Sequence, residues 1–505
     1  MTYVPPTGKP SVATQSAERK AMKDDLELIA DVRGGLSAMQ KRGGYYLPKY
    51  ENESPTEYAR RVAAAPWRPE FNDSLLSLAS KPFSKPVTLP DGTPEPVVKF
   101  AEDVDGQGNN IHVFARKLFM AGMADGVSLL IVSYPERTWG PTLADEKAAN
   151  PKPYWVHVPV EFIIACYTEM KNGKRIINHL RVWESVTERN GFEETIIRQI
   201  AVYEPGRWQR WREKESNGQP TAEWILHSEG ATLRNGKVPD RVEAVLFFTG
   251  ERLGDIRTTP PLRDLAFMQI ELYRALSRQD EVLTYAGSPM LGTSLAKPAD
   301  TTTVSVGPKI VLFGDGGGDS GAGTPPWAYV QPDAANIKEV RDQVASVIED
   351  MQRLGMQPTI TRSGDVSATE TSVVAAKAHS ALEAWAIGLK DCLEQAFIFT
   401  VEWMSAEAQR AIGNKAIAVS VNTDFGVGEM AAAEANVVLT AEKQNIISKK
   451  TARDELARRS ILGPSFDPSK EDQQIAEEMQ GLEPEEDIDP ATGDVIDLNS
   501  RRSGT

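Results

Sequence analysis

The sequence has no long apolar run. Its best short run, from Phe162 to Tyr167, is far below the ~20 residues that a membrane-spanning helix needs. The first fifteen residues, MTYVPPTGKPSVATQ, lack the apolar stretch of a secretory signal. We expect this terminus to be flexible and the chain to have no membrane partner.

Cysteine and histidine are scarce. The two cysteines, Cys166 and Cys392, fall in a predicted strand and a predicted helix, which argues against a disulfide framework and suits a reducing cytoplasm. The five histidines share no spacing, and neither His-x-x-x-His nor Cys-x-x-Cys occurs. We therefore predict structural histidines, no metal site and no cofactor.

Positive charge is in deficit. The 505 residues include 56 Lys and Arg against 71 Asp and Glu, a formal net charge of −15. Because phosphate binding depends on Lys and Arg, such a chain is not expected to grip DNA over its whole surface. It could still surround DNA without holding it.

Two stretches have helical periodicity. Helices are predicted from Ser16 to Gly34-Gly35, from Ser54-Pro55, and over 109–126, followed by a buried strand, VSLLIVSYP. Further along the chain, one helix is predicted to end near Gly287. The next predicted helix has apolar residues at heptad-like spacing, which would form a seam for packing against another helix. A helix of roughly 50 Å is predicted over 372–405, then a strand over 415–425 and two helices, the second capped by Ser448. The seam residues are Ile337, Val340, Val344, Val347, Met351 and Leu354.

Between these stretches, residues 154–249 have the pattern of β-strands. Short β-branched and aromatic runs are separated by four Asn-Gly pairs, the strongest short hairpin signal. We predict an antiparallel meander and an α+β fold.

A glycine-rich stretch, KIVLFGDGGGDSGAGTPPW, matches three enzyme signatures in part. A dinucleotide site needs a helix directly after Gly316-x-Gly318-x-x-Gly321, but Thr324-Pro325-Pro326 follows. A phosphate loop needs Gly-Lys-Ser/Thr, which is absent from the sequence. Ser320 has no predicted histidine base beside it. No active site is predicted.

GRWQRWR, residues 206–212, is the one basic and aromatic cluster. Stacking on bases with arginines on phosphates is one interpretation. We favour a structural one, in which Trp208 and Trp211 lie on a sheet and the arginines are solvated.

The order of these parts resembles the portal protein of tailed bacteriophages, the ring at one capsid vertex through which DNA passes. ATETSVVAAKAHSALEAWAIGLKDCLEQAFIF is similar to the family's spine helix, and ISKKTARDELARRSIL to a C-terminal helix. VEAVLFFTGERLGDIRTTPPLRDLAFMQIELYRALSRQDEVLTYAGSPML resembles its passage from meander to stem helix. GGYYLPKYENESPTEYARRVAAA resembles a portal-like family of phages and prophages.

The resemblance implies a portal fold with an α/β wing, a two-helix stem, a small β-containing clip, a spine helix and a helical crown. Its parts would be an N-terminal wing at 1–258, a first stem helix at 259–286, a clip at 287–332, a second stem helix at 333–355, a tunnel loop at 356–371, a spine helix and strand at 372–428, crown helices at 429–480, and a disordered acidic tail at 481–505.

The resemblance also implies residues and partners. DNA-facing residues in the tunnel loop would be Thr359, Thr361, Arg362, Ser363 and Asp365. Partner-facing residues in the clip would be Asp315, Gly316, Gly317, Gly318, Asp319 and Trp327. The chain would form a homo-oligomer, normally a dodecamer, around double-stranded DNA. It would meet the terminase large subunit, a head-tail adaptor, the major capsid protein and a scaffolding protein. It would be assembled in the bacterial cytoplasm and reside in the virion as a non-enzymatic part.

Two alternatives stay open at this point. One is a cytoplasmic serine hydrolase that uses Ser320 in a different fold. The other is another capsid or tail structural protein. Such a protein would also form a ring, but its function would not explain two stem-length helices on either side of a clip.

Overall fold

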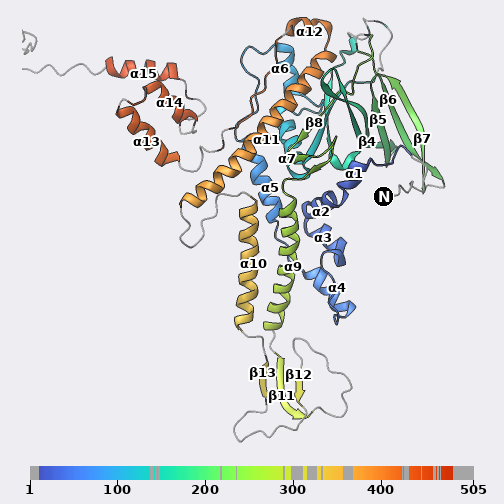
Figure 1. The fold of residues 1–505 in the computed structure, drawn as a ribbon, viewed down its shortest axis with the longest axis vertical. Helices are drawn as coiled ribbons and strands as arrows, with labels where there is room; N and C mark the ends of the chain where they lie inside the picture. Colours follow the sequence, from blue (N-terminus) through green and yellow to red (C-terminus); the bar gives the residue numbers. More distant parts are fainter. Residues whose placement is uncertain are drawn as a thin grey trace, which may run out of the picture. The chain divides into compact units, whose positions relative to one another are not determined.

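The computed structural model of the chain is α+β, as predicted (Figure 1). Its contacts divide it into two compact units, 1–423 and 424–505. The structure describes residues 11–136, 142, 145, 148–216, 219–234, 236–287, 290–296, 311–314, 327–330, 334–355, 368–413, 415–423, 425, 431–444, 446–458, 462, 466 and 468–480.

The first 125 residues supply the N-terminal helices. The first helix starts at Ser16 as predicted, where the Ser16 Oγ accepts a hydrogen bond from the backbone N–H of Arg19, but the single helix predicted up to Gly34 is interrupted at Met22. Ser54 and Glu57 form a reciprocal capping box at the helix that begins with Pro55, also as predicted. The elements are α1 (Ala17–Ala21), α2 (Lys23–Arg33), α3 (Gly35–Arg42), η1 (Gly43–Tyr45), α4 (Pro55–Ala64), α5 (Glu70–Ser80), η2 (Lys81–Phe83), α6 (Glu95–Glu102) and α7 (Ile111–Asp125).

The strands form two main sheets, where the sequence predicted one meander. The predicted strand at 127 is β1 (Val127–Ser133), buried along nearly its whole length. It takes the first and last strands of the expected meander as antiparallel partners, β2 (Tyr154–Pro159) and β8 (Ala244–Phe248). The meander prediction is wrong for β2 and β8. The apolar central strand β1 pairs along both of its edges, and the local sequence does not show which strands are its partners.

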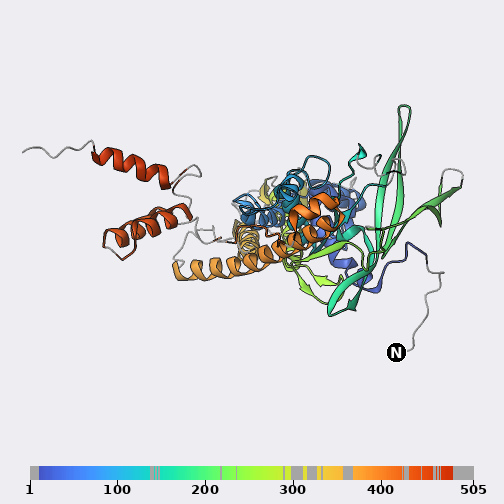
Figure 2. The same ribbon diagram turned by 90° about the horizontal axis from the view of Figure 1, so that it is seen from above.

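The remaining five strands do form an antiparallel meander, in chain order. The β3–β4 hairpin turns at Asn172 and Gly173, whose φ angles of 51° and 75° fit a two-residue hairpin loop. Figure 2 shows the sheet from a second direction. Its strands are β3 (Ile163–Lys171), β4 (Lys174–Asn190), β5 (Glu193–Glu204), β6 (Arg207–Ser216) and β7 (Gln219–Ala231), and η3 (Val160–Phe162) precedes them.

The long predicted helix is α11 (Ala368–Trp403), which contacts β8, β1 and α7. It is anchored in the core where the indole N–H of Trp155 donates to Oγ1 of Thr400 at 2.7 Å. Helix α12 (Ala406–Ile412) follows. The strand predicted over 415–425 is wrong. Ser420 forms one isolated β-bridge with Thr88, and the described residues around it belong to no strand.

The two cysteines lie where predicted, Cys166 in β3 and Cys392 in α11, and both are buried free thiols. Burial raises the pKa of each to about 12. Neither thiol is therefore a thiolate at neutral pH.

A helix–sheet–helix segment lies between β8 and α11. It consists of β9 (Glu251–Arg252), β10 (Thr258–Thr259), α9 (Arg263–Ala286), β11 (Met290–Ala296), β12 (Val311–Gly314), β13 (Trp327–Val330) and α10 (Ala334–Leu354). In the small sheet the order is β12-β11-β13, with β12 parallel and β13 antiparallel to β11.

The second unit is helical. Its helices are α13 (Ala431–Lys443), α14 (Lys449–Arg458) and α15 (Pro468–Gln480). The predicted cap is present, because Ser448 Oγ accepts from the N–H of Thr451. Among the residues that the structure describes, no helix is both long enough and apolar enough to span a membrane.

Candidate functional site

The helices expected over 259–286 and 333–355 are observed as α9 and α10, which pack side by side (Figure 1). Of the seam residues, Val344, Val347 and Met351 are buried. Leu354, at the last turn, is 42% exposed. The seam is therefore closed over the C-terminal half of α10 and opens at its end.

A buried amide ties α9 to the N-terminal helices. Gln269 is fully buried. Its Oε1 accepts from the backbone N–H of Phe71 at 3.0 Å, and its Nε2 donates to the carbonyl of Arg68 at 2.8 Å. Helix α5 has no side-chain cap of its own, so a residue of α9 satisfies one of its free N–H groups.

Two arginines tie α9 at other levels. Arg263 Nε lies 2.8 Å from Asp25 Oδ1. About three turns further along α9, Arg274 Nε donates a hydrogen bond to the backbone carbonyl of Tyr46 at 2.8 Å. Together with Gln269, these contacts fix α9 to the body of the first unit by directional bonds.

The charges of α9 and α10 are nearly balanced. Each helix has three basic and four acidic residues, a formal charge of −1 apiece. These are Arg263, Arg274, Arg278, Asp264, Glu271, Asp280 and Glu281 in α9, and Lys338, Arg341, Arg353, Glu339, Asp342, Glu349 and Asp350 in α10. The helix pair therefore carries −2 of the chain's formal charge of −15, whereas residues 471–505, with eleven acidic and two basic residues, carry −9 of it.

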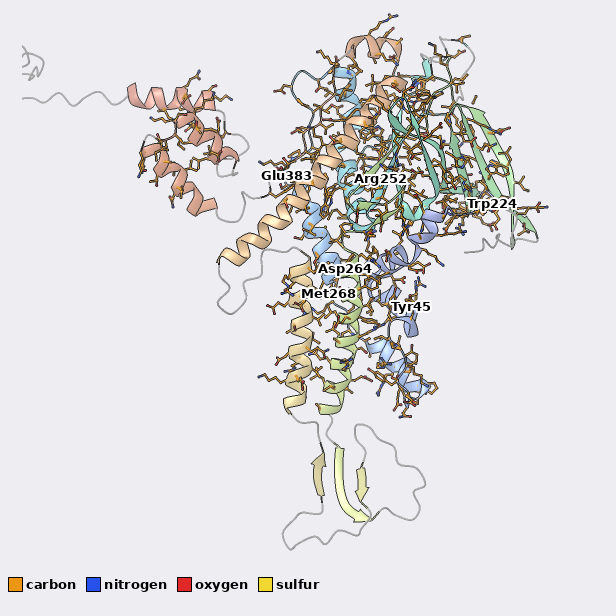
Figure 3. All side chains as sticks on the ribbon, viewed as in Figure 1. Tyr45, Trp224, Arg252, Asp264, Met268 and Glu383 are labelled. Carbon is orange, nitrogen blue, oxygen red and sulfur yellow. The ribbon has the colours of Figure 1, made fainter. Side chains whose placement is uncertain are left out.

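A groove of about 650 Å³ lies between α2, α3 and α9. Two aromatic side chains on its wall are solvent-accessible, Tyr45 at 74% and Phe267 at 51% (Tyr45 is labelled in Figure 3). Acidic residues outnumber basic ones along it, with Asp24 and Glu271 among them. The two exposed rings are of the residue types enriched at protein-contact surfaces, whereas carboxylates are depleted there.

Most residues predicted to face DNA or partners lie outside the described residues. This holds for Thr359, Thr361, Arg362, Ser363 and Asp365, and for Asp315, Gly316, Gly317, Gly318, Asp319 and Ser320. Trp327 is described, and it begins β13 of the small sheet. Trp327 is therefore the one predicted site residue that falls within the described part of the chain.

The GRWQRWR cluster lies on β6, and its arginines have carboxylate partners. This contradicts a set of free cations for phosphates and agrees with the structural interpretation. Because the guanidinium charges are compensated, the cluster is a poor phosphate-binding surface. The pairs are Arg207 with Glu229 at 2.6 Å, Arg210 with Glu184 at 3.4 Å and with Glu136, and Arg212 with Glu188 at 2.8 Å.

One serine–histidine pair could suggest a nucleophile. Ser128 Oγ lies 2.7 Å from Nε2 of His157. Ser128 is fully buried, and His157 Nδ1 has no hydrogen-bond partner among the described residues. Burial lowers the pKa of His157 to about 4. Because Ser128 is fully buried and no carboxylate among the described residues orients His157 Nδ1, we assign the pair a structural role.

Other histidines also have structural partners. His179 Nδ1 lies 2.9 Å from Glu204, and His112 Nδ1 accepts from the N–H of Val87. Within the described ranges no cluster of three metal-ligating side chains occurs.

Two surfaces were missed from the sequence: the groove beside α9, and the outer face of the β3–β7 sheet. The second had a readable signal. Trp183, Trp211 and Trp224 fall in three different predicted strands. Because successive side chains of a strand point to opposite faces of the sheet, the position of each tryptophan in its strand decides the face on which it lies. The groove joins helices more than 200 residues apart, for which a single sequence gives no pairing signal.

Comparison with known proteins gives one family match. A family described as "Domain of unknown function (DUF4055)" matches residues 261–404, from the start of α9 to the end of α11. No curated protein matches the chain.

The chain is also similar to chains of three solved particles. These are "Neck of empty GTA particle computed with C6 symmetry" (12% identity, 77% of this chain and 90% of that chain, TM-score 0.38), "Neck of native GTA particle computed with C12 symmetry" (11%, 77% and 89%, 0.37) and "Virion of native gene transfer agent (GTA) particle" (10%, 81% and 94%, 0.37). At these identities and scores, the similarities carry no argument about this chain.

Proposed function

We propose that this chain is the portal subunit of a tailed bacteriophage or prophage. It would form a non-enzymatic ring at one capsid vertex, through which DNA is packaged and ejected. The observation that supports this most is the order of elements: a packed helix pair, α9 and α10, brackets a small three-stranded sheet, and the 36-residue helix α11 follows. The residues that resemble the portal family lie in the same segments.

In this proposal α9 and α10 line the channel. Their formal charge of −1 each would give the wall a weak negative potential, and twelve whole chains would carry about −180. A wall of this kind repels phosphates weakly and holds none of them. Arg362, in the proposed tunnel loop, would be a local basic contact to the DNA.

The small sheet β11–β13 and the chain around it would be the clip. The segment from Asp315 to Asp319 and Trp327 would face the terminase large subunit during packaging and the head-tail adaptor later. The proposed crown at 429–480 would lie inside the capsid, and the wing would meet the major capsid and scaffolding proteins. ATP hydrolysis would belong to the terminase.

A closed ring of identical copies needs two different contact surfaces on each copy. In Figure 1, α2 and α3 lie on the side of α9 away from α10, and the groove of Asp24, Tyr45 and Phe267 is lined by residues of these three helices and η1. We place one of the two subunit contacts in this groove, because burial there would remove two exposed rings from water.

The mass of the purified assembly tests the proposal. A ring of twelve chains of 55.4 kDa would weigh about 665 kDa, and native mass spectrometry with end-on electron micrographs would show the count and the central hole. A monomer or dimer at micromolar concentration, in full-length protein that is folded by circular dichroism, would contradict the proposal. Ser320→Ala in the same preparations would leave the assembly unchanged.

A further inference from the structure

The outer face of the β3–β7 sheet carries an apolar cluster among polar residues such as Arg198, whose guanidinium lies over the Trp183 ring. Antiparallel sheets commonly have one face on the core and the other solvated. Here the inner face contributes Leu180, Val182 and Ala201 to the main core. The opposite face has a second cluster of buried apolar residues, Ile164, Ile200 and Val202, with Trp183, Trp211 and Trp224 packed against it.

The strand register brings the three tryptophans onto this face. Ile200 of β5 lies opposite both Trp183 of β4 and Trp211 of β6, and Trp224 of β7 pairs two residues further along β6. The rings of Trp183 and Trp224 are 5.4 Å apart, edge to face. The side chains of Trp183 and Trp224 therefore extend toward each other across β5 and β6, the strands that separate β4 from β7. Figure 3 labels Trp224 on β7.

This face is only partly covered in the described structure. The three indoles are half-buried. On the same face, Ile196 is 70% exposed and Leu226 is 37% exposed. An apolar surface of this extent on one sheet face normally contacts another segment or molecule.

The N-terminal segment already begins to cover it. Val12 and Ala13 pack against the outer cluster. Arg181 Nη1 donates to the carbonyl of Val12 at 2.7 Å and to that of Ser11 at 3.4 Å. The expectation of a flexible terminus is therefore wrong for 11–15, and the chain upstream of Ser11 starts beside the tryptophans.

We propose that residues 1–10 of the same chain bind across the tryptophans. Their sequence, MTYVPPTGKP, has a Tyr-Val-Pro-Pro core. Proline-rich segments bind aromatic surfaces because their extended helix is preformed and loses little entropy on binding. The apolar side chains of Tyr3, Val4, Pro5 and Pro6 complement the indoles.

The length of the segment is sufficient. Ten residues in that conformation span roughly 31 Å at ~3.1 Å per residue. Three strand spacings, from β4 to β7, amount to about 14 Å. The segment can therefore reach Trp224 from Ser11 without moving the residues that already contact Arg181.

Hydroxyl-radical footprinting with mass spectrometry tests this, because it reports solvent access one tryptophan at a time. In a full-length variant with Tyr3→Ser, Val4→Ser, Pro5→Gly and Pro6→Gly, we expect oxidation of Trp211 and Trp224 to rise several-fold. Trp155, which is 1% exposed, is the internal reference and should not change. Lys9→Ala, in the same segment, is the matched control and should leave all rates as they are.

Three outcomes would overturn the proposal. One is equal oxidation of Trp211 and Trp224 in the variant and the parent chain. Another is protection that disappears on dilution to a single chain, which would assign the covering segment to a neighbouring copy. The third is protection that returns only with another protein. Because variant and parent are also compared as single chains after dilution, the result is separate from that of the proposed function.

Discussion

A Cβ atom at Gly254 would lie 2.2 Å from Oε1 of Glu18, so helix α1 and the loop between β9 and β10 are in direct contact. The Glu18 carboxylate accepts three consecutive backbone N–H groups of that loop, from Asp255, Ile256 and Arg257, at 3.1, 2.9 and 3.2 Å. Helix α1 thereby holds the segment that leads from β8 into α9.

Gly254→Ala should destabilise the protein by displacing this carboxylate. We expect a loss of about 2 kcal/mol in the free energy of unfolding, since the three N–H groups lose their acceptor. In a Glu18→Ala background the same substitution should cost much less, because the carboxylate is already gone. Urea denaturation of the four proteins of this cycle measures the coupling, and additive losses would show that the contact is not responsible.

Gln269→Leu should weaken the contact between α9 and α5. The substitution leaves the buried N–H of Phe71 and the carbonyl of Arg68 without their partner, which costs about 2 kcal/mol. Gln107→Leu, at an exposed loop residue, is the control and should change stability little. If both variants unfold at the parent's midpoint, the amide does not cap α5 in solution.

Asp125 should make stability depend on pH. It is buried at the C-terminal end of α7, and burial raises the pKa of its carboxyl to about 6, although Arg33 lies 3.7 Å away and opposes this. Because the folded pKa is above the ordinary value near 3.8, the group's stabilising contribution is complete below that value. It is lost as pH rises through about 6.

Asp125→Asn therefore should be more stable than the parent at pH 8, by about 1–2 kcal/mol after allowance for the ion pair. The difference should shrink toward pH 4. Thermal or urea unfolding of both proteins across this range measures it. A variant that is less stable at pH 8 would mean that the Arg33 pair outweighs the burial of the charge.

Phe267→Glu should impair assembly without unfolding the subunit. The ring is half-exposed in the single chain, so its replacement should change folding stability by no more than about 0.5 kcal/mol. In the proposed ring it would place a carboxylate in a buried, acidic contact. Native mass spectrometry should then show single chains or small oligomers.

Val98→Glu, on α6 and 40% exposed, is the matched control and should still form the parent assembly. If Phe267→Glu also forms it, the groove is not a subunit contact. The portal proposal itself would stand in that case, because another surface could close the ring.

Local patterns in the sequence predicted helix ends better than strand partners. The cap at Ser54 and the Asn172-Gly173 turn depend on a few adjacent residues, and both were correct. The pairing of β2 and β8 with β1 depends on residues about 30 and 120 positions apart, and here the prediction failed. The strand expected around Ser420 failed for the same reason, since within the described residues its pairing is limited to one bridge with Thr88, 332 positions away.

The site was harder to predict than the fold. Glycines and a serine drew attention to 315–320, where three enzyme signatures overlap in part, but such short motifs carry meaning only in a particular structural context. The groove and the tryptophan face arise from helices and strands that meet only in the folded chain. Their residues, such as Phe267 and Trp224, look like ordinary core positions in the sequence.

The unequal attachment of α9 and α10 has a mechanical consequence. Helix α9 is held to the N-terminal helices by directional bonds from Arg263, Gln269 and Arg274. Helix α10 meets α9 mainly through the buried residues Val344, Val347 and Met351, with one directional contact, from Arg278 of α9 to Gln343 at 3.4 Å. The hydrophobic effect is non-directional, although interdigitated side chains still favour one register, so sliding α10 breaks fewer of the described directional bonds than moving α9 does. A load applied along the pair should therefore shift α10 before α9, and a pulling experiment through the segment that joins them would record two yield forces, the lower one from α10.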